Sequence, residues 1–410
     1  MHSTPATRSS RAGFTRTLAA SLLLSVPAGL FAGDQSILVS SWEDLHNVRL
    51  FLSGSYILER DLGPLDEGYD IYASPAANDG AGWLPIGGGS TFFTGVLDGQ
   101  GHTITGLHVN KEESQAGLFG AVWGGEIKDL GLADVNITSG GGSVGALSGF
   151  LRGTVTNSWS TGSITGGSDQ AGGLVGSGRV IMDSCWSGAT VRSTSWVGGL
   201  IGFQQLESTV TNSYFVGSAT ALRPTAASHA GGLVADLFGT ISTSYAAGGV
   251  TASETGVEGG LVADLGPDGT VEDSYWDSVV TGTDTSEGGG TPLTPAQMKG
   301  AAAVTHMTAL DFDDVWVTMQ EGVAINGIVP VNDGYPILRN LPIEPQLMAQ
   351  APLIPPAARA MGDFDSNGCV NFQDFLFMLE NWNRAIDGIP IGFNDFLALL
   401  ENWGEGCVPL

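Results

Sequence analysis

The chain has 410 residues, 15 of them basic and 42 acidic, which gives a formal net charge of −27 at pH 7. This charge argues against binding to nucleic acid or to an anionic membrane surface, because both need basic patches on the protein. Glycine supplies 62 residues, far above the average of about 7%, and no collagen period accompanies it. The excess glycine indicates many tight turns in a folded protein.

Residues 1–32 have the pattern of an export signal. Arg8, Arg11 and Arg16 precede an apolar run at 18–32 that contains small residues suited to cleavage. The run is shorter than a membrane-spanning helix, and no later stretch is apolar enough to be one. The sequence therefore predicts a secreted or cell-surface protein that loses residues 1–32 and has no transmembrane segment.

A capped helix is predicted soon after the signal. Ser41 is suited to the N-cap, and Asp44 stands three residues later, where an acid can complete the cap. Tyr56-Ile57-Leu58 then has the composition of a strand. We expect this helix to shield the open edge of the first structural unit, because an exposed strand edge promotes aggregation.

A glycine-rich box recurs through the middle of the chain. Its fullest copy is Ala171-Gly172-Gly173-Leu174-Val175-Gly176, and its leucine returns at similar intervals, at positions 118, 147, 174, 200, 233 and 261. Short apolar segments that repeat at this period and are separated by glycine predict stacked coils of short strands. The expected fold is mainly β, a β-solenoid with its leucines inside.

A second set of residues repeats in step with the boxes. Its copies are Asn157-Ser158-Trp159, Asp183-Ser184-Cys185, Asn212-Ser213-Tyr214, Thr243-Ser244-Tyr245 and Asp273-Ser274-Tyr275. We expect the last residue of each copy to join a ladder inside the solenoid, which would bury Cys185 and make it unreactive. The Asn and Asp side chains are expected to bond to turn backbone.

These repeats resemble those of the GLUG-repeat family. The resemblance rests on the boxes, the second set of repeats, the stretch 93–104, Tyr275-Trp276-Asp277 and the closing 334–338. Members of that family are bacterial secreted and surface proteins, and the repeats also occur in the non-catalytic N-terminal part of IgA-specific metalloproteases. The resemblance implies a right-handed β-helix with small capping helices, which we place at residues 33–340.

The end of the solenoid carries its own signals. Thr294 is suited to cap a helix whose first residue is Pro295, because the missing N–H costs nothing there. This helix and a final strand at Gly334-Tyr335-Pro336-Ile337-Leu338 are expected to close the stack. Prolines and alanines then dominate residues 341–361, which predicts a semi-rigid linker.

A calcium loop is predicted after the linker. Oxygen-bearing side chains occupy loop positions 1, 3, 5, 9 and 12, a glycine occupies position 6, and position 7 offers a backbone carbonyl. A hard cation such as calcium takes six to eight oxygen ligands, and the glycine permits the sharp turn. The predicted metal ligands are Asp363, Asp365, Asn367, Cys369, Asn371 and Asp374.

The loop opens a small α-helical module at residues 362–410. Its first helix has an apolar face, which recurs further along the chain and is followed both times by Glu-Asn-Trp. The two copies of this face are Phe372, Phe375, Leu376 and Leu379, and then Phe393, Phe396, Leu397 and Leu400. This duplication resembles a type I dockerin, which implies EF-hand-like calcium binding and a cohesin-like protein partner. The second copy lacks oxygen ligands at its first loop positions, so we expect one calcium ion. Whether Cys369 pairs with Cys407 is left open.

No catalytic motif stands out. None of the six histidines begins a His-Glu-x-x-His metalloprotease motif, and the few basic residues are scattered. Asp98 and His102 share a glycine-rich corner, which we interpret as a turn. We therefore expect a non-enzymatic adhesion or matrix-binding protein, with a glycan or a surface protein as its ligand. The alternative is a polysaccharide hydrolase or lyase, which a cluster of carboxylates on one face would favour and a smooth polar face would disfavour.

Overall fold

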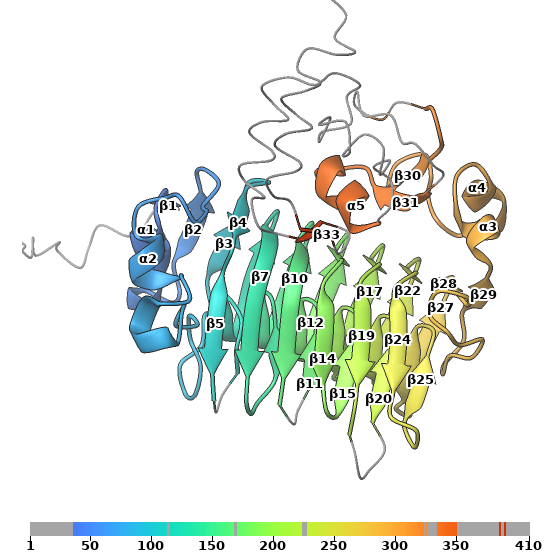
Figure 1. The fold of residues 1–410 in the computed structure, drawn as a ribbon, viewed down its shortest axis with the longest axis horizontal. Coiled ribbons are helices and arrows are strands. Elements are labelled where there is room, and N and C mark those ends of the chain that lie inside the picture. The colour runs from blue at the N-terminus through green and yellow to red at the C-terminus, as the bar shows by residue number, and fades with distance from the viewer. Residues whose placement is uncertain are drawn as a thin grey trace, which may run out of the picture. The chain divides into compact units, whose positions relative to one another are not determined.

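The computed structural model describes residues 36–112, 115–167, 170–223, 228–323, 325 and 334–350, and the backbone of 385–386 and 389–390. The predicted export signal and the six predicted calcium ligands lie outside the described residues. The described part is mainly β, as expected, and the coils of a β-solenoid follow one another along it (Figure 1).

Three parallel sheets form the coils. The first contains β1 (Ile37–Val39), β2 (Ser55–Leu58), β3 (Val96–Asp98), β6 (Phe119–Lys128), β9 (Ser148–Thr156), β12 (Val175–Asp183), β16 (Ile201–Gln204), β17 (Thr209–Thr211), β21 (Val234–Leu237), β22 (Thr240–Ser242), β26 (Val262–Leu265) and β27 (Thr270–Glu272). The second contains β4 (Thr103–Thr105), β5 (His108–Lys111), β7 (Gly131–Ser139), β10 (Trp159–Gly166), β13 (Trp186–Ser187), β14 (Thr190–Ser193), β18 (Tyr214–Phe215), β19 (Ser218–Ala221), β23 (Tyr245–Ala246), β24 (Gly249–Ala252), β28 (Tyr275–Asp277) and β29 (Thr291–Leu293). The third contains β8 (Val144–Gly145), β11 (Gln170–Gly172), β15 (Trp196–Gly198), β20 (His229–Gly231) and β25 (Val257–Gly259).

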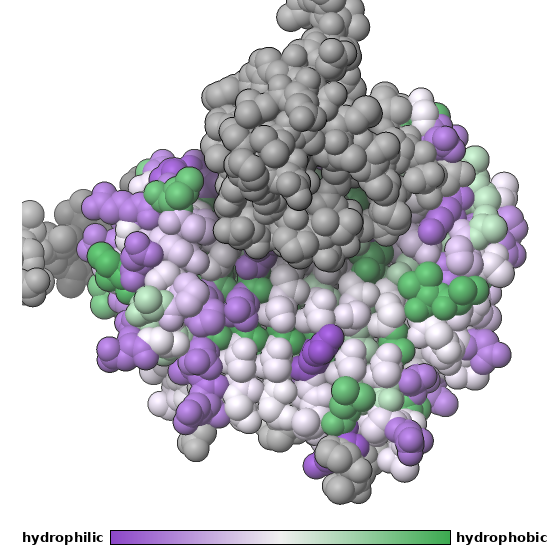
Figure 2. All heavy atoms as spheres, viewed as in Figure 1, coloured by the Kyte–Doolittle hydropathy of each residue, from purple (hydrophilic) through white to green (hydrophobic). Residues whose placement is uncertain are grey.

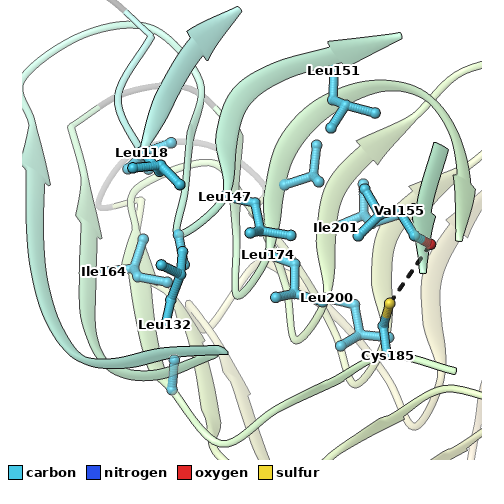
Figure 3. Close-up of a cluster of buried hydrophobic side chains, with 14 of the residues drawn as sticks. Leu118, Leu132, Leu147, Leu151, Val155, Ile164, Leu174, Cys185, Leu200 and Ile201 are labelled. Carbon is cyan, nitrogen blue, oxygen red and sulfur yellow. Dashed lines mark hydrogen bonds between the residues drawn. The ribbon is translucent and has the colours of Figure 1, made fainter. Parts of the chain in front are cut away.

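The box leucines lie inside the coils, as predicted. All six are fully buried, and neighbouring members of the column are seen in Figure 3. The residue after each box leucine shows the register, since Val175 pairs with Ile201 and Val234 pairs with Val262 in adjacent parallel strands. A box therefore contributes one leucine to the same place in successive coils, and the stack buries a continuous apolar core.

The aromatic column lies outside the coils, which corrects the prediction that it would be interior. Its members are Trp159, Trp186, Tyr214, Tyr245 and Tyr275. The first four rings stack with centroids 5.0 to 5.6 Å apart and planes within 7° of parallel. The residue after each tyrosine, such as Phe215, joins the inner core instead, because successive side chains of a strand point to opposite faces.

Cys185 does not occupy the aromatic column. Trp159 pairs with Trp186, so the repeat in this coil is Ser184-Cys185-Trp186, one residue later than predicted. Cys185 takes the place that Ser213 holds in the next coil, and its N–H donates to the Ser213 hydroxyl. It is fully buried, as expected, and burial raises the pKa of its thiol.

The N-terminal end is closed by short helices. They are α1 (Trp42–Asn47), the 3₁₀ turn η1 (Val48–Leu50), α2 (Tyr69–Tyr72) and the 3₁₀ turn η2 (Ala77–Gly80). The predicted cap is confirmed, since the Ser41 hydroxyl accepts from the Asp44 N–H at 3.1 Å. Trp42 is fully buried and packs against Trp83 at a ring distance of 6.2 Å. These helices supply the apolar contacts that the first coil lacks.

Residues 293–323 and 334–350 contribute side chains that cover the aromatic column, and we call them the C-terminal cover. Their elements are α3 (Pro295–Met298), α4 (Ala302–His306), β30 (Trp316–Met319), β31 (Gly334–Leu338) and α5 (Ile343–Ala349). Thr294 caps α3 as predicted, with its N–H donating to Gln297. The predicted closing strand does not extend the stack, because β31 pairs antiparallel with β30 and packs on the aromatic rings.

Helix α5 falls inside the stretch expected to be a linker. Pro345 lies in its first turn, where the backbone N–H has no partner within the helix in any case, so proline is tolerated. Residues 351–361 of the expected linker lie outside the described residues. Within the predicted module, β32 (Ala385–Ile386) and β33 (Ile389–Pro390) pair as short antiparallel strands.

Candidate functional site

An open groove crosses the outer face of the first sheet. It consists of two adjoining hollows of about 390 Å³ and 490 Å³ that share Arg152 and Arg179. Trp123 lines one hollow, and Phe203 and Phe238 line the other. We call these five residues and the space between them the aromatic–arginine groove.

Strand register brings the groove residues together. Trp123 on β6 pairs with Arg152 on β9, and Arg152 pairs with Arg179 on β12, so the three side chains occupy one position in three successive coils. The register shifts between Trp123 and Gly125, and Gly124 between them has a φ of 77°. This β-bulge leaves Trp123 45% exposed at one end of the groove.

Aromatic and cationic groups lie against one another in the groove. The Arg152 guanidinium lies 4.7 Å from the Trp123 ring centre, and the Phe203 and Phe238 rings are 5.4 Å apart. Arg179 pairs with Glu207, whereas no ion pair involves Arg152 among the described residues. Arg152 therefore retains donor capacity for a ligand beside an exposed ring.

A second cluster lies beside the groove. His229 begins β20, while Asp236 on β21 and Asp264 on β26 are register partners in adjacent coils. One ligand atom from each of the three residues lies within 4.8 Å of the others. Phe203 of the groove is the register partner of Asp236 on its other side. We call these three residues the His–Asp–Asp cluster.

Burial and mutual interaction shift the pKa values in this cluster. The His229 Nδ1 lies 2.5 Å from an Asp236 carboxylate oxygen, and this hydrogen bond raises the pKa of His229. Burial raises the pKa of Asp236, and the nearby charge of Asp264 acts in the same direction. Asp264 itself is exposed, so the cluster is open to solvent on one side.

The outer face of the second sheet carries a row of polar residues. Polar residues occupy one register position in successive coils, namely Asn110, Thr138, Thr165, Arg192, Thr220 and Thr251. Figure 2 shows this face as rows of residues of intermediate hydropathy that run across the coils. A polar face is the feature expected above for adhesion, and a group of carboxylates such as the His–Asp–Asp cluster is the feature expected for an enzyme.

The residues considered together in the glycine-rich corner separate in the structure. Asp98 forms an ion pair with Lys128 at 3.0 Å and accepts the Gln100 N–H, whereas His102 contacts Asp61 at 3.1 Å. These bonds fit the interpretation of the corner as a turn. The Asn157 amide donates to Asp129 in the preceding coil, and the Asn212 amide donates to Asp183, so these side chains bond to side chains of the neighbouring coil and not to turn backbone as predicted.

Sequence reasoning missed both the groove and the cluster, although repeats contain a signal for each. Phe150 and Phe203 stand at the same place after their box leucines, which are Leu147 and Leu200. Leu-Val-Ala-Asp-Leu occurs twice, and its two copies place Asp236 and Asp264 in register. Both sites could have been found by looking for a polar or aromatic residue that recurs at the same position of successive repeats, where its side chain points out of the coil.

Comparison with known proteins supports the fold. No protein-family model matches the chain. The crystal structure of a "putative immunoglobulin A1 protease" from Bacteroides ovatus has a TM-score of 0.55 and 19% identity, covering 74% of this chain and 92% of that one. The chain thus shares its β-solenoid fold with that protein.

Two curated proteins are similar in sequence. Halomucin from Haloquadratum walsbyi is 38% identical over 104 residues, which are 24% of this chain and 1% of halomucin. A "putative Gly-rich membrane protein" from Evansella cellulosilytica is 26% identical over 397 residues, covering 70% of this chain and 45% of that protein. The chain therefore spans less than half the length of either relative. Within the described residues, no helix has both the length and the apolar character needed to cross a membrane.

Proposed function

We propose that the chain is an exported, non-enzymatic adhesion protein that binds an extended carbohydrate along the aromatic–arginine groove. The alignment of Trp123, Arg152 and Arg179 across three coils carries the proposal. An exposed tryptophan offers a flat apolar face to a sugar ring, and guanidinium groups donate to hydroxyl oxygens. Because neighbouring strands are about 4.8 Å apart, the groove continues from coil to coil and suits a linear polymer.

A neutral polysaccharide fits the groove better than an acidic one. Only two arginines line the groove, and Arg179 is already paired with Glu207. The net charge of −27 repels polyanions at long range. The guanidinium groups then act as hydrogen-bond donors to sugar hydroxyls and not as counterions for a charged polymer.

A surface location and a tether complete the proposal. The resemblance to GLUG-repeat proteins, the predicted export signal at 1–32 and the relative described as a membrane protein support a secreted or surface-held chain. We assign attachment to the dockerin-like module at 362–410, which is expected to bind calcium through the Asp363–Asp374 loop and to dock on a cohesin-like partner.

A polysaccharide-degrading enzyme is the second candidate. The carboxylates of Asp236 and Asp264 favour it, because their oxygens approach within 4.8 Å, close to the about 5 Å of a retaining glycosidase pair. However, neither residue lines the two hollows, and Asp236 is hydrogen-bonded to His229. The groove and the carboxylates therefore do not form one cleft, and binding remains the first candidate.

Affinity electrophoresis of the full chain in gels that contain glucan, xylan, mannan or an acidic polysaccharide tests the proposal. We expect retardation by a neutral polymer, and we expect Trp123→Ala to weaken it about tenfold, since loss of a stacked ring costs on the order of 1 kcal/mol. Phe51→Ala is a matched control, because Phe51 is 55% exposed and outside the groove.

Two outcomes would contradict binding through the groove. One is the absence of retardation in every gel, and the other is equal retardation of the parent chain and Trp123→Ala. Release of reducing sugar that Asp264→Asn abolishes would instead establish the enzyme.

A further inference from the structure

The His–Asp–Asp cluster has more negative charge than its neighbours neutralise. Asp236 and Asp264 are direct register partners, and like charges at such positions destabilise a sheet. Among the described residues, His229 is the one basic group that forms an ion pair with either carboxylate. The Asp236 side chain is only 9% exposed, so water screens it poorly.

We propose that His229, Asp236 and Asp264 bind a divalent transition-metal ion of the Zn²⁺ class. The three residues bring one imidazole nitrogen and two carboxylate oxygens together from three strands, all within 4.8 Å. A bound dication offsets both carboxylate charges at once. This site depends neither on carbohydrate binding nor on the predicted calcium loop.

The donor set selects the class of ion. An imidazole with two carboxylates is a ligand set for Zn²⁺, Mn²⁺ or Co²⁺, whereas Ca²⁺ requires six to eight oxygens. Three protein ligands leave at least one coordination position open, and the exposed side of Asp264 admits the ion and a water molecule.

Binding changes one hydrogen bond. The His229 Nδ1 and the Asp236 oxygen are hydrogen-bonded at 2.5 Å, with one proton between them. Zn²⁺ bonds of about 2.1 Å place two ligand atoms of a tetrahedral site about 3.4 Å apart, so this contact opens and the proton leaves to solvent. The required movement is about 1 Å, within the reach of side-chain rotation because the His229 ring is partly exposed.

The position of the site is also informative. Asp236 is the register partner of Phe203 and lies two residues before Phe238, so the ion would lie beside the aromatic end of the groove. A metal ion with an open coordination position there presents a positive charge at the groove's end. A hydroxyl or other oxygen group on a ligand that extends beyond Phe203 can then coordinate the metal ion directly.

Calorimetric titration of the full chain with Zn²⁺ tests the site. The chain is first stripped with a chelator and then saturated with Ca²⁺, which occupies the predicted calcium loop and leaves the cluster free. We expect one Zn²⁺ per chain with proton release, and a thermal midpoint that rises with Zn²⁺. Co²⁺ is expected to give the visible absorption of a nitrogen–oxygen site.

Single substitutions locate the ion. Asp264→Asn and His229→Gln are each expected to weaken Zn²⁺ binding by about 100-fold. Even substitution of a residue that only hydrogen-bonds to a metal ligand lowers metal affinity about 10- to 100-fold. Asp264 is exposed, so loss of binding in that variant does not reflect unfolding. Asp268→Asn, an exposed acid nearby in sequence, is the matched control and is expected to bind as the parent chain does.

The proposal is overturned if Asp264→Asn and His229→Gln both bind Zn²⁺ as tightly as the parent, or if excess Ca²⁺ alone prevents Zn²⁺ binding. Neither result bears on the polysaccharide gels, where Trp123→Ala is the decisive variant.

Discussion

One residue in each of six coils adopts a left-handed backbone conformation before the aromatic column. These residues are Asp129, Asn157, Ser184, Asn212, Thr243 and Asp273, with φ between 46° and 55°. Asn and Asp tolerate this conformation, whereas a β-branched residue is strained in it. Thr243 therefore holds strain that the surrounding ladder tolerates, with its hydroxyl donating to Asn212 at 2.9 Å.

Replacing Thr243 with asparagine is predicted to stabilise the solenoid by about 1 kcal/mol, because asparagine adopts the left-handed conformation at lower cost. An asparagine amide also suits the column, since Asn212 donates to Asp183 in the same way. Thermal denaturation measures the change. Thr211→Asn, at a strand position, is the matched control and is expected to lower the midpoint. A lower midpoint for Thr243→Asn would mean that the threonine contacts outweigh its strain.

The sequence predicts the inward leucines because they recur at one position of the glycine-rich box. It does not predict which way the aromatic column points, since Tyr214 and Phe215 are both apolar and adjacent. Burial on two sides removes the polar–apolar alternation that distinguishes the faces of a strand. The one-residue error at Cys185 has a related origin, because coils of unequal length leave the repeat alignment ambiguous.

At the scale of elements, a buried amide links α5 to the solenoid. Gln346 accepts from the Tyr214 hydroxyl at 3.0 Å and from the Leu338 N–H at 2.7 Å, and its amide group donates to the Leu338 carbonyl at 3.0 Å. The side chain thus joins the helix, β31 and the aromatic column. Each of these groups is buried, so each needs its partner.

Gln346→Leu is predicted to destabilise the C-terminal cover by about 2 kcal/mol or more, since it leaves two buried donors unpaired at about 1–3 kcal/mol each. Hydrogen exchange should show faster exchange in β30, β31 and α5 than in the coils. Glu344→Gln, on the exposed side of α5, is expected to leave exchange unchanged. Unchanged exchange in Gln346→Leu would show that apolar packing alone holds the cover.

At the scale of the whole molecule, the module at 362–410 is predicted to bind one calcium ion. Asp363, Asp365 and Asp374 would repel one another without a cation, so binding and folding of the loop should be coupled. In calorimetry on the full chain, Asp363→Ala should weaken calcium binding strongly and Asp387→Ala should change it little. A stoichiometry of two would mean that the second loop also binds.

The repeat period predicts the stack and its core, and the Ser41–Asp44 capping pattern predicts the N-terminal helix, because both depend on local sequence. The groove and the His–Asp–Asp cluster depend on which outward positions meet across coils. That requires the length of each coil, which varies along the stack because the box leucines are unevenly spaced. A shift of one residue reverses the face to which a strand residue points.

The route of the chain past the aromatic column determines how the protein would carry mechanical tension. A force applied at residue 350 is transmitted first to the coils that contain Tyr214 and Tyr245. The Tyr214 hydroxyl is bonded to Gln346, and the Tyr245 hydroxyl is bonded to the Pro336 carbonyl. The last coils are therefore not part of the path by which a force on residue 350 reaches the groove. Under force, the C-terminal cover would peel away and lengthen, while the hydrogen-bonded coils that present the groove stay intact.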